Sequence, residues 1–190
     1  MNKILSLDPS GTGTTGIFFK EEQKEEFGQF KSKEWEEHLK FLIILIKEYQ
    51  PNIIIFENTT YIYGRQHQGT VGLYKLIGGI VCLKNCFSFL SEINSIAVNQ
   101  VKAFKNKLFA GKEQIESLTC EPGRGKGWKY KNKKINLHQL DALIIYHLWS
   151  DGSLESKANI AEKIRVLQAK KRLGIRQKEQ LERLERIYNG

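Results

Sequence analysis

At 190 residues with a formal net charge of +9, the chain suits one domain that buries its own core and leaves too little length for two domains that enclose a nucleotide. Its three scattered cysteines form no CxxC pair, and its longest apolar run, residues 41–46, is far shorter than the roughly 20 residues of a membrane span, so we expect a soluble, cytoplasmic protein without a disulfide framework, a zinc cluster or a membrane partner. Residues 1–100 carry a net charge of −1, whereas 101–151 and 152–190 carry +5 each, which predicts a polyanionic partner such as nucleic acid.

The first predicted elements are a β-hairpin and a helix. Residues 3–7, "KILSL", alternate in polarity and end at Asp8, and "GIFFK" at 16–20 forms a second strand after a turn rich in Gly and Thr. Residues 33–49 carry apolar side chains at helical spacing, and Pro51 ends this helix.

The middle of the chain predicts alternating strands and helices. The elements expected after Pro51 are a strand at 52–56, a helix at 70–86, a strand at 93–99, a helix at 100–109 and a helix at 135–149. The first of these, "NIIIF", is wholly apolar, which is typical of a central parallel strand. In the helix at 70–86, Gly72 and Gly79 share roughly one face and permit close approach of a neighbouring helix.

The C-terminal part of the chain is basic. Residues 121–134, "EPGRGKGWKYKNKK", combine Gly and Pro with Lys and Arg, which predicts a mobile basic loop. The element order predicts an α/β fold with helices around a mixed sheet. We expect one domain at 1–150, followed by a charged helical extension at 151–190.

Three acidic residues interrupt apolar segments, where a charge is costly. Asp8 ends the first strand, Glu57 follows the strand at 52–56, and Asp141 lies within the last predicted helix. Acids at the ends of neighbouring strands meet in the crevice where open α/β sheets place their sites, and converging carboxylates attract a hard divalent metal. His138 lies on the same helix face as Asp141 and is a candidate fourth ligand or proton-transfer group.

Each of these residues also has a purely structural interpretation. Asp8 could cap a turn, and Glu57 could end its strand in solvent. Asp141 could pair with a lysine of the basic loop, and His138 could lie in an ordinary interface.

The order of these acids carries a family resemblance. An Asp after strand one, a Glu after the first parallel strand and a late "HxxDA" helix, His138 to Ala142, resemble the RuvC family of Holliday-junction resolvases in the RNase H-like superfamily. The likeness spans most of residues 1–149. It implies an RNase H-like mixed five-stranded sheet flanked by helices, with the C-terminal charged helical extension as an addition.

Further short motifs resemble the same family. "DPS" followed by Thr15 and Gly16 is similar to the family's opening loop, although Ser10 stands where the family usually has Gly. Lys102 in "NQVK" and Lys112 in "AGKEQ" resemble its downstream lysine segments. The resemblance implies that both lysines act in catalysis by meeting the scissile or a neighbouring phosphate. Either lysine could instead be ordinary solvated surface.

The resemblance also implies an activity and its cofactor. It implies a homodimeric, structure-selective endonuclease that resolves four-way DNA junctions in recombination and repair by paired nicks, with helix 70–86 similar to the family's dimerisation segment. It implies two Mg²⁺ ions, for which Mn²⁺ can substitute, held by Asp8, Glu57 and Asp141, with His138 coordinating metal or orienting water.

DNA contact is predicted for the basic and aromatic residues near these sites, because lysine and arginine neutralise phosphates and aromatic rings stack on exposed bases. The family's aromatic wedge position is Thr60 here, with two tyrosines just beyond it. A solvated loop with incidental aromatic residues is the alternative. The predicted DNA contacts are Tyr61, Tyr63, Arg65, Arg124, Lys126, Trp128, Lys129, Tyr130, Lys131, Lys133 and Lys134.

Two other functions stay open at this point. One is a different RNase H-like nuclease, acting on RNA–DNA hybrid, pre-ribosomal RNA or transposon ends. The other is a nucleic-acid-binding protein that keeps the fold without catalysis. A nucleotide-binding loop of the actin or Hsp70 type is disfavoured by chain length, and the sequence contains no Walker signature.

Overall fold

The computed structural model describes residues 2–58, 68–120 and 127–151. Its elements, in chain order, are β1 (Lys3–Asp8), β2 (Gly13–Glu21), β3 (Lys24–Ser32), α1 (Trp35–Tyr49), β4 (Ile53–Asn58), α2 (Gln68–Cys82), the 3₁₀-helix η1 (Leu83–Asn85), β5 (Glu92–Ala97), α3 (Val98–Phe109), β6 (Leu118–Cys120), β7 (Trp128–Tyr130), β8 (Lys133–Ile135) and a helix at 137–151. Within these residues, no helix is both long and apolar enough to cross a membrane.

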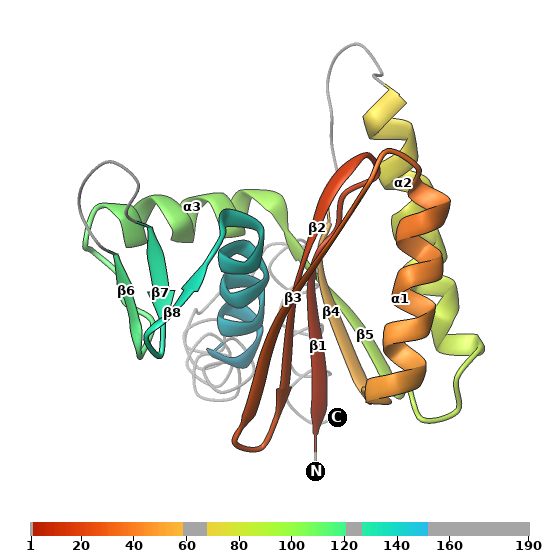
Figure 1. Ribbon diagram of the computed structural model, residues 1–190, viewed down its shortest axis with the longest axis horizontal. Helices are drawn as coiled ribbons and strands as arrows, with labels where there is room; N and C mark the ends of the chain where they lie inside the picture. The colour runs from red at the N-terminus through yellow and green to blue at the C-terminus, as the bar shows by residue number, and fades with distance from the viewer. Residues whose placement is uncertain (1, 59–67, 121–126, 152–190) are drawn as a thin grey trace, which may run out of the picture. The chain divides into compact units, whose positions relative to one another are not determined.

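A mixed five-stranded sheet forms the centre of the fold, in the order β3-β2-β1-β4-β5 (Figure 1). The β1–β2 and β2–β3 pairs are antiparallel, whereas β1–β4 and β4–β5 are parallel. The two central parallel strands are the apolar ones, as their sequences predict. This confirms the predicted α/β fold with a mixed five-stranded sheet.

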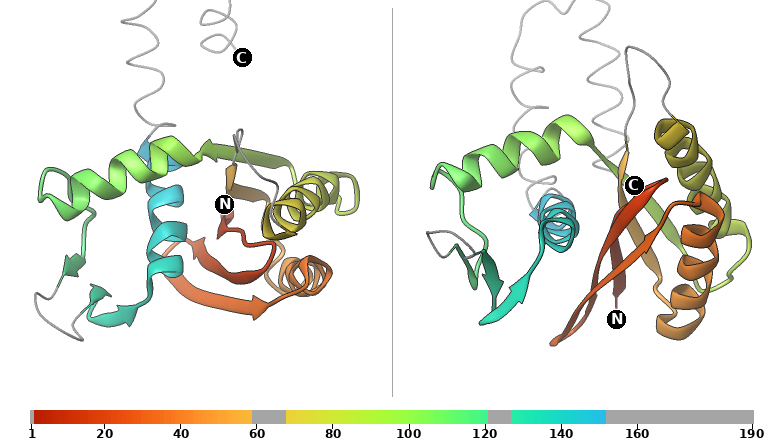
Figure 2. Two further views of the ribbon diagram at one scale, coloured as in Figure 1. Left: turned by 90° about the horizontal axis from the view of Figure 1, so that it is seen from above. Right: turned by 45° about the horizontal axis from the view of Figure 1, so that its top comes forward.

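Helices cover both faces of this sheet (Figures 1 and 2). Side chains alternate along β1, so Leu5 and Leu7 point to the face covered by α1 and α2. Ser6 points to the other face, where its hydroxyl donates a hydrogen bond of 2.7 Å to the carbonyl oxygen of Ala142. The sheet therefore fixes β1 between two helical layers.

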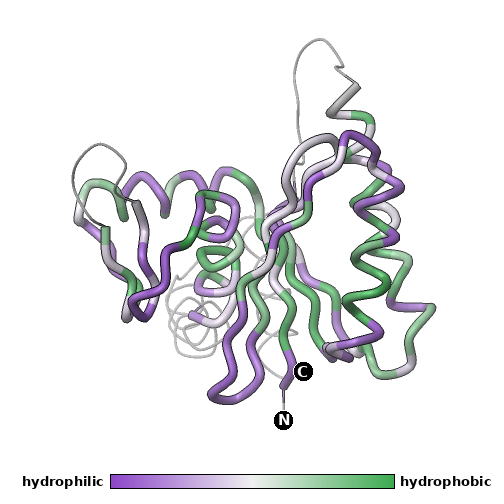
Figure 3. The backbone as a smooth tube through the Cα atoms, viewed as in Figure 1, coloured by the Kyte–Doolittle hydropathy of each residue, from purple (hydrophilic) through white to green (hydrophobic). Residues whose placement is uncertain are grey.

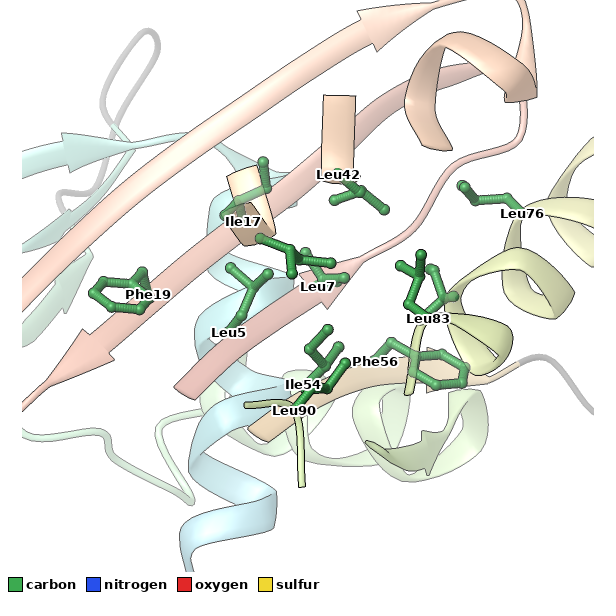
Figure 4. Close-up of a cluster of buried hydrophobic side chains, with 12 residues drawn as sticks. Leu5, Leu7, Ile17, Phe19, Leu42, Ile54, Phe56, Leu76, Leu83 and Leu90 are labelled. Atoms are coloured by element: carbon green, nitrogen blue, oxygen red, sulfur yellow. The ribbon is translucent and has the colours of Figure 1, made fainter. Parts of the chain in front are cut away.

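A core cluster of buried hydrophobic residues joins β1, β2 and β4 to α1 and α2 (Figure 4). Leu42 of α1 and Leu76 of α2 are fully buried against the strands. Figure 3 shows hydrophobic residues along the central strands and a hydrophilic hairpin between β2 and β3. Burial of this many large apolar side chains supplies most of the favourable free energy of folding.

The structure corrects several predicted elements. β3 was missed in the chain-order prediction because its sequence, KEEFGQFKS, carries mostly charged and polar residues and lies at the sheet edge. The predicted basic loop at 121–134 is wrong from residue 128 onward, because β7 and β8 pair there in a small antiparallel sheet with β6. The predicted helix at 135–149 begins two residues later than expected.

Gly72 and Gly79 of α2 pack within the chain. A Cβ on Gly79 would lie 2.9 Å from Cδ2 of Leu39 in α1, so the predicted close approach of a neighbouring helix is confirmed. Gly72 instead faces the β1–β2 turn, where a Cβ on Gly11 would lie 2.1 Å from the backbone nitrogen of Leu73.

The chain divides into two compact units, Met1–Leu148 and Trp149–Gly190. Almost all of the second unit lies outside the described residues. The basic helical extension expected at 151–190 therefore stays a prediction.

Candidate functional site

Glycine at position 16 brings Asp8 and His138 together. Asp8, the last residue of β1, pairs in register with Gly16 of β2. A Cβ on Gly16 would lie only 2.0 Å from the carbonyl oxygen of His138, so only glycine lets the helix at 137–151 lie this close to β2. Nδ1 of His138 then lies 2.9 Å from Oδ2 of Asp8.

A chain of hydrogen bonds holds the turn that follows Asp8. The backbone N–H of Ser10 donates to Oγ1 of Thr15 at 3.1 Å, and Oγ1 of Thr15 lies 2.8 Å from Nδ1 of His38. Nε2 of His38 lies 3.1 Å from the carbonyl oxygen of Ser32. Because that carbonyl can only accept, Nε2 carries the proton and Thr15 donates to Nδ1. His38 is fully buried, so this network fixes the turn from inside the fold.

Glu57 lies beside Asp8 on the neighbouring strand. β1 and β4 are parallel, and Leu7 of β1 pairs with Phe56 of β4. Asp8 and Glu57 are the next residues of these two strands, so they lie at the same level of the sheet. Burial, together with the charges of Asp8 and Asp141, raises the pKa of Glu57 to about 7 against the opposing effect of lysines on α3. Glu57 is therefore a carboxylate whose charge the protein leaves only partly compensated.

Asp141 comes from the helix at 137–151 and meets a lysine of α3. Nζ of Lys105 lies 2.7 Å from Oδ1 and 2.8 Å from Oδ2 of Asp141. Only the Oδ2 contact has hydrogen-bond geometry, so Oδ1 is buried without a hydrogen bond. Burial raises the pKa of Asp141 despite Lys105, and the charge of Asp8 adds to that increase.

His138 is the exposed member of the group. Its side chain is 48% exposed, whereas that of Asp8 is 17% exposed. The hydrogen bond to Asp8 raises the pKa of His138, and burial opposes this effect. With Nδ1 donating to Asp8, the neutral ring keeps Nε2 as its acceptor and proton-binding atom.

The donor set suits a hard divalent cation, although the side chains form two pairs. In residues 2–58, 68–120 and 127–151, no three side chains of His, Cys, Asp or Glu are arranged as a complete metal-binding group. The pairs are His138 with Asp8 and Lys105 with Asp141. Glu57 and Asp141, whose Oδ1 accepts no hydrogen bond, nevertheless bring together carboxylates that repel one another, and carboxylate oxygens are the ligands that Mg²⁺ prefers.

One of the two lysines near Glu57 was not predicted from the sequence. The lysines that lower the pKa of Glu57 are Lys102 and Lys105, both on α3. Sequence reasoning missed Lys105, although its position one helical turn after Lys102 was a signal that it lies on the same face. Lys112 lies beyond the end of α3, after Gly111, and its contact with phosphate stays a prediction.

The predicted DNA-contacting residues fall into three groups. Tyr61, Tyr63, Arg65, Arg124 and Lys126 lie outside the described residues. The aromatic residues of β7 are partly used in packing, since Trp128 is 7% exposed and Tyr130 packs edge-on against Phe18 and Phe27. Nζ of Lys131 lies 2.6 Å from Glu25. Lys129, Lys133 and Lys134 lie on the same small sheet.

Comparison with known proteins shows the fold. No family model matches the sequence, and no curated protein matches it. Among solved structures, RuvC of T. thermophilus in complex with a Holliday junction substrate is similar with a TM-score of 0.50 and 14% identity, over 76% of this chain and 90% of that chain. This likeness shows that the chain has the RNase H-like fold found in RuvC.

Two other solved structures are similar at a lower level. One is the yeast mitochondrial Holliday junction resolvase Ydc2, with a TM-score of 0.45 and 11% identity, over 76% of this chain and 75% of that chain. The other is YeaZ from Pseudomonas aeruginosa, also with a TM-score of 0.45 and 11% identity, over 80% of this chain and 94% of that chain.

Proposed function

We propose that this protein is a divalent-metal-dependent endonuclease that resolves four-way DNA junctions. The observation that carries the proposal is the group of carboxylates at the ends of β1 and β4, in which Glu57 has its pKa raised to about 7. A catalytic site is where uncompensated carboxylates are expected. The RNase H-like fold and the likeness to a RuvC in complex with a Holliday junction substrate support this choice of reaction and substrate.

The proposed site would take Mg²⁺, with Mn²⁺ as a substitute. Asp8, Glu57 and Asp141 would hold the metal, which would supply Lewis-acid stabilisation of the phosphoryl oxygens and a more acidic water. Lys105 neutralises part of the charge of Asp141. This ion pair limits the repulsion among the carboxylates in the folded protein.

His138 is the proposed proton acceptor. Its Nδ1–H donates to Asp8, which orients the ring and stabilises a positive charge on it. Its Nε2 can therefore take a proton from a water molecule whose oxygen bonds to phosphorus. The bond from phosphorus to the 3′ oxygen breaks, and that oxygen takes a proton from solvent. The products carry a 5′-phosphate and a 3′-hydroxyl.

A homodimer would place two such sites on two strands of the junction. The exposed face of α2 carries Val71, Tyr74 and Val81, which are 40%, 43% and 52% exposed. Together with Gly78, next to which a Cβ would meet nothing within 4 Å, they recur at helical spacing. A stripe of this kind on one helix suits a self-complementary interface.

The dimer is tested by Tyr74→Glu, with Ile44→Glu on α1 as the matched control because Ile44 is 63% exposed. We expect Tyr74→Glu to give a monomer in light scattering and the control to stay dimeric. A wild-type protein that is monomeric at high concentration, with and without junction DNA, would contradict the dimer.

The activity is tested with Mg²⁺ and three substrates: an immobile four-way DNA junction, a linear duplex and an RNA–DNA hybrid. We expect paired nicks in the junction alone, and loss of cleavage of at least about 1,000-fold in Asp8→Asn and Asp141→Asn, because each removes charge that binds the metal. Glu92→Gln, at the exposed start of β5, is the control. Cleavage of the hybrid instead would indicate another RNase H-like nuclease, and binding without cleavage a silent binding protein.

A further inference from the structure

An apolar hollow lies beside the proposed catalytic histidine. It has a volume of about 610 Å³ and is lined mainly by Phe109, Trp128, Ile135, Leu137 and His138. These residues come from the end of α3, from β7 and β8, and from the start of the helix at 137–151. Figures 1 and 2 show the end of α3 next to the small sheet. A hollow of this size is within the range of sites that hold small organic groups.

Two large apolar side chains are left open to solvent at this hollow. Phe109 and Leu137 are each 54% exposed. Trp128 is buried behind them, with its ring edge-on to Phe109 at 5.2 Å between centroids and 80° between planes. The buried tryptophan fixes the phenylalanine ring, so the hollow offers a supported aromatic face.

The hollow and the carboxylate site share His138. That residue lines the hollow, and its Nδ1 lies 2.9 Å from Asp8. A group in the hollow would therefore be attached within a short distance of a phosphate held at Asp8 and Glu57.

A lysine lies at the rim of the hollow. Lys134 of β8 passes Gly127, which lines the hollow, and its Cε would lie 3.8 Å from a Cβ on that glycine. Lys107, which pairs with Glu113 at 3.3 Å, and Lys112 flank Phe109 in the sequence. An apolar, aromatic floor with a lysine at its rim matches a nucleotide, whose base is flat and apolar on its faces and whose phosphates are anionic.

We infer that this hollow receives a nucleobase of the cleaved DNA strand, unstacked from its neighbours and placed against Phe109 and Leu137. The inference rests on the proposed function, and it adds a base-binding subsite to the catalytic site. Such a subsite favours DNA whose bases are already unpaired or easily unstacked, as at a branch point, because the cost of unstacking is then small.

The test measures binding, without cleavage, in EDTA. Phe109→Ala and Leu137→Ala are compared with Ile44→Ala, another exposed apolar residue on a distant helix. The substrates are an intact junction and a set of junctions with one abasic nucleotide at successive positions near the crossover. Two variants are used because Phe109→Ala also removes a contact to Trp128.

We expect each of the two variants to bind the intact junction about 10-fold more weakly than wild type, as for loss of one stacked base. Wild type should bind one of the abasic junctions about 10-fold more weakly than the intact junction. The two variants should bind that abasic junction and the intact junction with the same affinity. Equal affinity of variants and wild type, or an equal loss on every abasic junction, would overturn the subsite.

The behaviour of the wild type distinguishes failure of the base-binding subsite from failure of the proposed function. If wild type cleaves the junction and binds every abasic junction equally, the subsite alone is wrong. If wild type does not distinguish a junction from linear duplex, the proposed function is wrong, and the subsite is overturned with it.

Discussion

Glu57 and Glu25 are both withdrawn from solvent, and the protein treats their charges in opposite ways. Burial opposes ionisation of Glu25, but the close contacts of Lys131 and Lys20 outweigh it and lower its pKa. At Glu57, burial and two neighbouring carboxylates act together and raise the pKa to about 7. The Glu25 side chain is 10% exposed, so its ionisation depends on cations that the chain itself supplies.

The difference separates a structural carboxylate from a candidate catalytic one. Glu25 ties β3 to the turn between β7 and β8, and Lys131 comes from that turn. Glu57 stands at the end of a parallel strand, where open α/β sheets place their sites. Oε2 of Glu25 and Oδ1 of Asp141 are both buried without a hydrogen bond of good geometry, so the distinction depends on charge compensation and location.

The largest expected effect on stability is at Glu57. Its pKa is about 7 in the fold, whereas the ordinary pKa of a glutamate side chain is 4.5, so the folded state binds more protons between these values. Its contribution is fully present below pH 4.5 and is lost as the pH rises through about 7. We expect the free energy of unfolding of metal-free protein to fall from pH 5 to pH 8, by at most about 3 kcal/mol from this group.

Urea unfolding across this pH range measures the effect. In Glu57→Gln the fall should be smaller but not absent, because the pKa values of Asp141 and His138 are also raised. Glu92→Gln is the exposed control. Added Mg²⁺ should restore more stability at pH 8 than at pH 5, because it binds ionised carboxylates. A profile that is identical in wild type and Glu57→Gln would contradict the uncompensated charge.

A second test concerns the close approach that builds the carboxylate site. Gly16→Ala would place a Cβ against the backbone of His138 at 2.0 Å, so β2 and the helix must separate. We expect a loss of about 1–3 kcal/mol of stability and a weakened His138–Asp8 contact. Gly28→Ala is the matched control on the next strand, because its Cβ would lie 3.5 Å from Ile17. Equal thermal midpoints for the two variants would argue against this account.

The sequence predicted the carboxylate site better than its surroundings, for a physical reason. Asp8, Glu57 and Asp141 interrupt apolar runs, and the parallel pairing of β1 with β4 follows from those runs. Gly16 belongs to a predicted short motif, and the structure explains it as the point where the helix contacts β2. Local pattern and tertiary arrangement agree in this part of the fold.

Sequence reasoning missed strands with a weak apolar pattern and contacts between distant segments. β3 and β7–β8 are short or strongly charged, although β3 pairs with β2 and β8 pairs with β7 across tight turns. The sequence left open an ion pair between Asp141 and a lysine of the basic loop. In the structure, Lys105 of α3 forms this ion pair instead. Trp128 was predicted to stack on bases, yet it is mostly buried beneath Phe109.

The opposite sign of pH dependence is expected at Glu25. Because its pKa is lowered, its contribution is present above the ordinary glutamate value of 4.5 and is lost as the pH falls through the folded pKa. Glu25→Gln should cost about 1–2 kcal/mol at pH 7 and reduce the acid sensitivity of unfolding. Glu21→Gln is the control, since its pair with Lys3 is more exposed and worth little. If Glu25→Gln stabilised the protein at pH 7, the conclusion that ionised Glu25 stabilises the fold would be wrong.

The smallest expected effect belongs to the basic surface of the small sheet. Lys133 is exposed on β8, where it can neutralise a phosphate without reading a base. Lys133→Ala should weaken junction binding by a few-fold, lower the dependence of log affinity on log salt by about 1, and leave cleavage at saturating DNA unchanged. Lys40→Ala on α1, an exposed lysine paired with Glu37, is the control. Because the small sheet is proposed to bind DNA while the carboxylates cleave it, a Lys133→Ala variant that cleaves more slowly at saturating DNA would contradict this division of roles.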